Sequence, residues 1–204
     1  MFVSSYGLPN LVCTDEECNL LKTHCNRLPD DHIFNDNDRR IQYFLNFSKL
    51  DGKVRRKLEL LNTFLRSGFP FCEPTDWVCL ASLPGCERQS QHTDFDAGLI
   101  RRATNDGINV AAFPYSCLAA INDGAKLYIS SDKREKAISY NRGDVIIFRG
   151  DIVHAGTESV EGHFGRIHVY LDSANVKHTK NGTHLTSCHT DEIRVPLSKR
   201  LRNK

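Results

Sequence analysis

The sequence lacks several features that would place it in a specialised class of protein. It contains no C-x-x-C pair, which excludes the usual structural zinc knuckle. No apolar run approaches the roughly 18 residues of a membrane-spanning helix, so no membrane partner is predicted. The opening MFVSSYGLPN has no charged stretch followed by an apolar one, which argues against a secretory signal. A net charge of +2 excludes a protein that holds nucleic acid by bulk electrostatics alone.

Residues that bind metals are abundant, with nine His and eight Cys among 204 residues. The cysteines have no spacing typical of a zinc site or a small disulfide scaffold, so we expect reduced thiols that act as small buried apolar groups. Reduced thiols without an export signal predict an intracellular protein, cytoplasmic or nuclear. A second possible metal cluster near the C-terminus matches no common structural zinc spacing; it comprises His178, His184, Cys188 and His189.

The hydrophobic pattern predicts a single domain of residues 1–204 in three parts. Residues 11–70 are expected to form a helical support, with helices at 11–28 and 51–67. Residues 75–173 carry many short strands without helix-length gaps, which predicts a mainly β domain of the α+β class, an antiparallel sandwich or barrel. Residues 174–204 are expected to be a basic, irregular tail. The expected strands cover residues 77–83, 89–94, 108–113, 116–122, 126–130, 136–140, 144–149, 152–156 and 166–171.

One short motif has the spacing of a metal site. In a strand, residues i and i+2 point to the same face, so His92 and Asp94 can direct two ligands at one ion. A distant His154, which follows a Gly-Asp turn and an apolar strand, would complete a set of two histidines and one carboxylate. That set is typical of non-haem Fe(II) oxygenases. The spacing alone is weak, since His189-Thr190-Asp191 repeats it, but no histidine follows that second copy.

The strand after His154 supplies a fourth candidate. Period-two alternation places Arg166, His168 and Tyr170 on one face of residues 166–171 and the apolar residues on the other. An arginine facing the interior of a barrel is costly unless it meets an anion. A dicarboxylate could supply that anion, held by the planar fork of the guanidinium.

The set His92-x-Asp94, His154 and Arg166 resembles the Fe(II)/2-oxoglutarate-dependent dioxygenase superfamily. The segment from Leu83-Pro84-Gly85 to Asp94 is similar to that of the prolyl hydroxylase-like branch, although that branch typically has Lys where Arg166 stands. The resemblance implies a jelly-roll core, or double-stranded β-helix, with supporting N-terminal helices. It also implies Fe(II) held by His92, Asp94 and His154, 2-oxoglutarate as co-substrate held by Arg166, and O2.

The implied activity is hydroxylation, or demethylation through hydroxylation, with release of succinate and CO2. The sequence leaves open the substrate, the oligomeric state and the role of His168. One alternative is a cupin-like jelly roll that uses the same three residues without 2-oxoglutarate turnover. Another is a nucleic-acid-binding module that uses the basic residues of the helix at 51–67 and of the tail.

Overall fold

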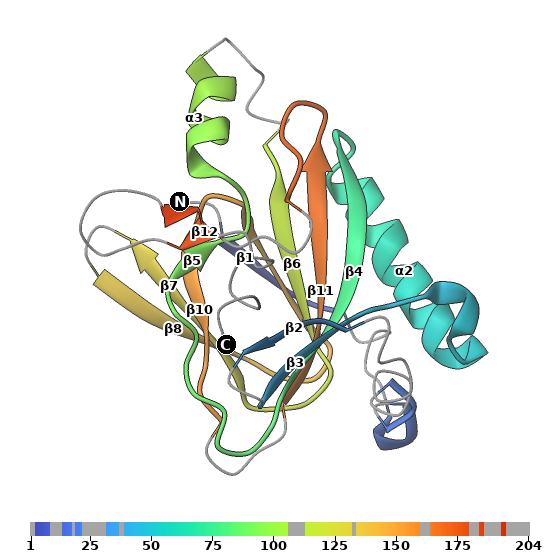
Figure 1. The fold of residues 1–204 in the computed structure, drawn as a ribbon. Coiled ribbons are helices and arrows are strands. Elements are labelled where there is room, and N and C mark those ends of the chain that lie inside the picture. The colour runs from blue at the N-terminus through green and yellow to red at the C-terminus, as the bar shows by residue number, and fades with distance from the viewer. Residues whose placement is uncertain are drawn as a thin grey trace.

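The protein folds into two facing antiparallel sheets with a helix packed on the outer face of one of them (Figure 1). The computed structural model describes residues 3–8, 14–17, 19–21, 32–36, 39–105, 113–131, 134–159, 164–179, 184–185 and 193–194. The larger sheet has the strand order β1-β9-β6-β11-β4-β3-β2, and the smaller sheet has the order β13-β12-β5-β10-β7-β8. The prediction of a mainly β fold is therefore confirmed.

The strands of the larger sheet come from residues 3 to 173 of the described chain. They are β1 (Val3–Gly7), β2 (His32–Asp36), β3 (Arg40–Phe44), β4 (Cys72–Ser82), β6 (Tyr115–Ala120), β9 (Asp144–Arg149) and β11 (Phe164–Ser173). The smaller sheet contains β5 (His92–Thr93), β7 (Ala125–Ser131), β8 (Arg134–Tyr140), β10 (Val153–Gly156), β12 (His184–Leu185) and β13 (Ile193–Arg194). The helical elements are η3 (Phe47–Lys49), α2 (Gly52–Gly68) and α3 (Ala97–Asn105).

Helix α2 covers the outer face of the larger sheet, alongside β4 (Figure 1). Asp51 caps it by accepting a hydrogen bond from the backbone N–H of Lys53. Its buried residues are spaced for a single apolar face, as the sequence predicted: Val54, Leu58, Leu61 and Leu65. They pack on the outward side chains of β9 and β11, namely Val145, Ile147, Ile167, Val169 and Leu171.

The other face of the larger sheet packs against the smaller sheet. In strand β9 the side chains alternate between the two faces of the sheet. Val145 and Ile147 face α2, while Ile146 and Phe148 enter the core between the sheets. In β11 the residues that face this interior are Arg166, His168 and Tyr170. The alternation predicted for this strand therefore places polar side chains between the two sheets.

Three secondary-structure expectations need correction. The N-terminal support is only partly helical, because β2 and β3 lie within residues 11–70 and extend the larger sheet. Residues 15–17 and 19–21 are helical, but the rest of the expected first helix lies outside the described residues. Helix α3, capped by Asp96, follows Asp94 where no element was expected. In the C-terminal tail, β12 pairs with β5, so the tail is not wholly irregular.

Four cysteines fall within the described residues, and all are free and buried: Cys72, Cys79, Cys86 and Cys117. Burial raises the pKa of Cys117 above its usual value, which favours the neutral thiol. Cys13, Cys18, Cys25 and Cys188 lie outside the described residues, as does most of the strand expected at 108–113. Within the described part of the chain, no helix combines the length and the apolar character needed to cross a membrane.

Candidate active site

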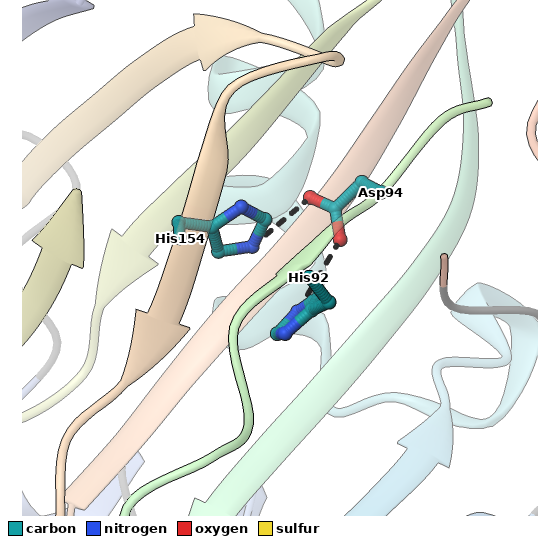
Figure 2. Close-up of side chains that lie close together, drawn as sticks. All are labelled: His92, Asp94 and His154. Carbon is teal, nitrogen blue, oxygen red and sulfur yellow. Dashed lines mark ion pairs between the residues drawn. The ribbon is translucent and has the colours of Figure 1, made fainter. Parts of the chain in front are cut away.

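The three residues of the predicted metal set meet between the two sheets. His92 is in β5, Asp94 follows directly after β5, and His154 is in β10, where it is the antiparallel partner of His92. One ligand atom of each lies within 4.8 Å of the others. Figure 2 shows the two imidazole rings converging on the carboxylate of Asp94. All three side chains are buried, with relative exposures of 6%, 2% and 4% for His92, Asp94 and His154.

Backbone carbonyl groups fix the orientation of both histidine rings. The Nδ1 atom of His92 is 2.8 Å from the carbonyl oxygen of Ser90, and that of His154 is 2.9 Å from the carbonyl oxygen of Ile152. When each Nδ1–H donates to its carbonyl, each Nε2 presents a lone pair to the interior. These Nε2 atoms lie 3.9 and 3.6 Å from the carboxylate oxygens of Asp94. The neutral tautomer that a metal requires is therefore the one that the backbone selects.

The protonation states also suit metal binding. Burial lowers the pKa of His92 to about 4, and the neighbouring His154 acts in the same direction. Burial likewise lowers the pKa of His154. For Asp94, burial alone would raise the pKa, but the surrounding histidines outweigh it and hold the pKa well below its usual range. At neutral pH the site therefore presents two neutral imidazoles and one carboxylate, as a divalent ion requires.

Two further side chains face the carboxylate of Asp94. Ser116, on β6, donates its hydroxyl to Oδ2 of Asp94 at 2.5 Å. The Nε2 atom of His168 lies 3.3 Å from the same oxygen. Hydrogen bonds to a metal-binding carboxylate fix its orientation. No sequence pattern indicates that Ser116 reaches Asp94, because Ser116 is on β6 of the larger sheet and Asp94 follows β5 of the smaller sheet.

Arg166 lies in the same pocket, next to the three candidate ligands. Arg166 is only 3% exposed, forms no ion pair with any described residue, and its Nε has no hydrogen-bond partner among them. A buried cation without a counter-ion is costly. The arrangement therefore favours an anionic ligand at Arg166.

The part of the pocket around Arg166 is tightly packed. A Cβ atom on Gly156 would lie 2.8 Å from Nη2 of Arg166, 2.8 Å from Nη1 of Arg40 and 2.4 Å from Oε1 of Gln89. A larger residue at this position would therefore require the ends of these side chains to shift. Tyr140 is also buried close by, and its hydroxyl has no partner within the described part of the chain. Burial raises the pKa of Tyr140, and Arg166 and Arg40 partly oppose that rise.

Sequence reasoning missed Arg40, which lies on the unexpected strand β3. Its side chain is fully buried and donates to the hydroxyl of Ser82 and to the carbonyl oxygens of Glu87 and Thr157. It thereby ties the end of β4 and the segment before β5 to the end of β10. Gln42, two residues further along β3, lines the pocket. No motif marks these residues, so no signal in the sequence could have identified them.

The C-terminal candidates from the sequence do not join this pocket as described ligands. His178 pairs with Asp76 and Asp172 instead of joining a cysteine cluster. For His184 only the backbone position in β12 is described. The remaining candidates, including the second His-x-Asp pair, lie outside the described residues: Cys188, His189 and Asp191.

The fold is the double-stranded β-helix of solved 2-oxoglutarate- and Fe(II)-dependent oxygenase structures, as the sequence resemblance implied. No protein-family model matches the chain, and no curated protein gives a significant match. The chain is similar to AviO1 from Streptomyces viridochromogenes, with 16% identity, coverage of 87% and 92% of the two chains and a TM-score of 0.58. A Pseudomonas putida prolyl-4-hydroxylase gives 13% identity, coverage of 84% and 92% and a TM-score of 0.54.

A third similar structure is the viral collagen prolyl hydroxylase from Paramecium bursaria Chlorella virus-1, solved in complex with 2-oxoglutarate. It is 12% identical, with coverage of 85% of this chain and 97% of that chain and a TM-score of 0.57. At these identities the likeness establishes the fold alone. The chemistry of this chain has to be argued from its own residues.

Proposed function

We propose that the protein is an Fe(II)- and 2-oxoglutarate-dependent dioxygenase that hydroxylates an unidentified substrate, or demethylates it through hydroxylation. One observation carries the proposal: two histidines, a carboxylate and an arginine without an anionic partner among the described residues share one buried pocket. Two imidazoles and one carboxylate leave several positions open on a six-coordinate ion, which is typical of non-haem Fe(II) oxygenases. Oxygenase activity among proteins of the same fold supports this proposal.

Each residue has a distinct part in the proposed site. His92, Asp94 and His154 would hold the iron through Nε2, a carboxylate oxygen and Nε2. Arg166 would bind the far carboxylate of 2-oxoglutarate, and Tyr140 offers a second donor close to it. When bound, iron and 2-oxoglutarate would supply the oxidising chemistry, in which one atom of O2 enters succinate as CO2 leaves and the other enters a substrate C–H bond.

Part of the pocket wall is apolar, which supports this chemistry. Leu80, Leu118 and Leu127 line the pocket beside the candidate metal ligands, and all three are buried. An apolar lining strengthens the electrostatic interactions inside the site and limits the access of water to reactive species. The tautomer of each histidine is already set by a backbone carbonyl, so the ligands need little rearrangement to receive a metal.

The proposal is tested by measuring succinate release from 2-oxoglutarate in the presence of Fe(II) and O2. Wild type should release succinate, and Asp94→Ala should abolish the release because it removes one of three ligands. Asp191→Ala is the matched control, since it alters the second His-x-Asp pair, and it should retain activity. If the anaerobic Fe(II) protein develops no visible charge-transfer band on addition of 2-oxoglutarate, the proposal is wrong.

The same variants separate this proposal from a cupin-like metal protein. Such a protein has no need of a buried anion-binding arginine, so unchanged ligand affinity in Arg166→Met would favour the cupin-like alternative. A nucleic-acid-binding role for α2 is less well supported. Three of its basic side chains, Arg55, Lys57 and Arg66, form ion pairs with acidic residues of the chain.

A further inference from the structure

The register of strand pairing places His92 opposite His154 but does not place Asp94. Strand β5 ends at Thr93, and its described register with β10 is the single pair of His92 and His154. Asp94 follows the strand, in the segment that leads to α3. A further contact is needed to hold the backbone of Asp94 against the strand that bears His154.

The turn between β9 and β10 makes that contact with the residue directly after Asp94. The backbone N–H of Phe95 donates to the carbonyl oxygen of Gly150 at 3.1 Å. Two residues further along the same turn, the carbonyl oxygen of Ile152 lies 2.9 Å from Nδ1 of His154. One short turn is therefore linked to the neighbour of Asp94 and to the ring of His154.

The turn can lie this close to Phe95 because Gly150 has no side chain. A Cβ atom on Gly150 would overlap Cδ2 of Phe95 and would lie 2.8 Å from Cγ and 3.0 Å from Cε2 of the same ring. Gly150 is not among the described glycines with a positive φ, so alanine could adopt its backbone conformation. Glycine is needed at this position for the space and not for the backbone.

The ring of Phe95 is held on several sides. It is 0% exposed and packs in one cluster with Ile100 and Val176. Its centroid is 6.0 Å from that of Tyr170 and 6.2 Å from that of His178, with interplanar angles of 67° and 75°. In a close-packed interior a displaced ring transmits strain to its surroundings. A side chain added at Gly150 would therefore shift the backbone of Phe95 together with its ring.

We propose that the contact between Phe95 and Gly150 positions Asp94 against His154, and so sets the geometry of the candidate metal set shown in Figure 2. Phe95 and Gly150 are positioning residues, because neither offers a side-chain ligand to a metal. The inference rests on the proposed function, since it assumes that the three residues of the set bind a metal. It concerns the metal alone and makes no use of the pocket around Arg166.

Gly150→Ala tests the inference through Co(II) binding to the full-length protein, followed by calorimetry and by the visible spectrum of the bound ion. The added methyl group should displace Phe95 and with it Asp94. We expect Co(II) affinity to fall about 10- to 100-fold, as for other changes in the support of metal ligands, and the visible bands to change. Gly52→Ala is the matched control, because nothing lies within 4 Å of a Cβ added there. It should bind Co(II) as wild type does.

A second pair of variants shows whether Gly150 acts through the ring of Phe95. Phe95→Ala removes all three atoms that the added Cβ would meet most closely. The double variant Gly150→Ala/Phe95→Ala should therefore bind Co(II) as Phe95→Ala alone does, although Gly150→Ala weakens binding when the ring is present. This comparison also serves if Gly150→Ala alone does not fold. A double variant that binds Co(II) much more weakly than Phe95→Ala would overturn the inference.

Hydrogen exchange in the wild-type protein tests the same contact without a substitution. Because energetic coupling is reciprocal, a metal that binds the positioned arrangement must also stabilise it. Saturating Co(II) should slow exchange of the Phe95 amide, which donates to Gly150. It should leave unchanged the amide of Phe69, which donates to Leu65 at the end of α2.

Two further results would overturn the inference: an unchanged exchange rate at Phe95, or Co(II) affinity in a folded Gly150→Ala equal to that of wild type. A wild-type protein that binds no Co(II) would instead refute the metal site of the proposed function. The two failures are therefore distinguishable.

Discussion

The imidazole rings of His92 and His154 face each other across the antiparallel pair of β5 and β10, with their centroids 4.3 Å apart and their planes inclined by 56°. The two residues are direct partners in the register, and each Nδ1 is within hydrogen-bond distance of the carbonyl oxygen two residues earlier. Strand pairing thus sets the distance between the rings, and the backbone carbonyls set their tautomers. The relative position of two candidate metal ligands is determined by the main chain.

Ser116 should contribute to metal affinity without touching the metal. Its hydroxyl is fully buried and holds Oδ2 of Asp94 at 2.5 Å. We expect Ser116→Ala to weaken Co(II) binding by about 10- to 100-fold, because the carboxylate loses the bond that orients it. Ser130→Ala is the control, since Ser130 accepts a hydrogen bond from Gln91 away from the metal set. Equal Co(II) affinities in the two variants would contradict this role for Ser116.

Replacing Arg166 should have opposite effects on stability and on binding. Without an anion, Arg166→Met removes a buried charge that has no acidic partner among the described residues. We expect the metal-free protein to gain about 1–4 kcal/mol in free energy of unfolding, a rise in Tm of roughly 2–16 °C by thermal unfolding. The same variant should lose most of its affinity for 2-oxoglutarate.

Arg149→Met provides the comparison for that stability effect. Arg149 pairs with Asp151 at 2.6 Å and stacks over Phe113, so its loss should lower Tm. If Arg166→Met destabilises the protein as Arg149→Met does, Arg166 already has an adequate partner and needs no anion.

Gly156→Ala should disturb the pocket around Arg166 by steric contact. The added Cβ would meet Arg166, Arg40 and Gln89 at distances that real Cβ atoms do not adopt. We expect 2-oxoglutarate affinity to fall at least 10-fold in calorimetry while Co(II) affinity stays close to that of wild type. Gly52→Ala is a matched control, because nothing lies within 4 Å of a Cβ added there. Wild-type affinity in Gly156→Ala would show that the guanidinium groups can move aside freely.

The stability of the protein should depend on pH through His178. Burial opposes its protonation, but the hydrogen bonds and charges of Asp172 and Asp76 outweigh burial and raise the pKa above 6.5. Because the folded state binds the proton more tightly than the unfolded state, this contribution is fully present below pH 6.5 and is lost as pH rises through the folded pKa. Urea unfolding at pH 6 and pH 8.5 should show a larger decline for wild type than for His178→Asn. Parallel pH profiles would refute this assignment.

The proximity of His92, Asp94 and His154 could be predicted from the sequence because part of this candidate set is local. His92 and Asp94 are neighbours on one strand face, and the alternation of β11 correctly separated Arg166, His168 and Tyr170 from the apolar residues that face α2. Sequence patterns contain this information because side-chain direction in a strand has a period of two. Asp94 and His154 are distant in sequence, so their meeting was inferred from resemblance and is a property of the folded sheets.

Strand β3 could not be predicted for a physical reason. Its inward residues Arg40 and Gln42 are polar because they serve the pocket, whereas Ile41 and Tyr43 occupy the alternate positions. A rule that assigns apolar residues to the interior therefore gives no clear signal here. Helix α3 was missed because it is only nine residues long and begins with Ala97-Gly98, directly after the metal motif.

The hydrogen bonds of Arg40 also determine how much of the chain is needed for a working pocket. A shortened chain that starts at residue 45 would retain His92, Asp94, His154 and Arg166. It would lose Arg40, which joins the carbonyl oxygens of Glu87 and Thr157. The segment that contains Glu87 and the segment that contains Thr157 would then lose the hydrogen bonds that link them through Arg40. We therefore expect that a chain with an intact pocket must include Arg40, which lies well upstream of the first metal-binding candidate.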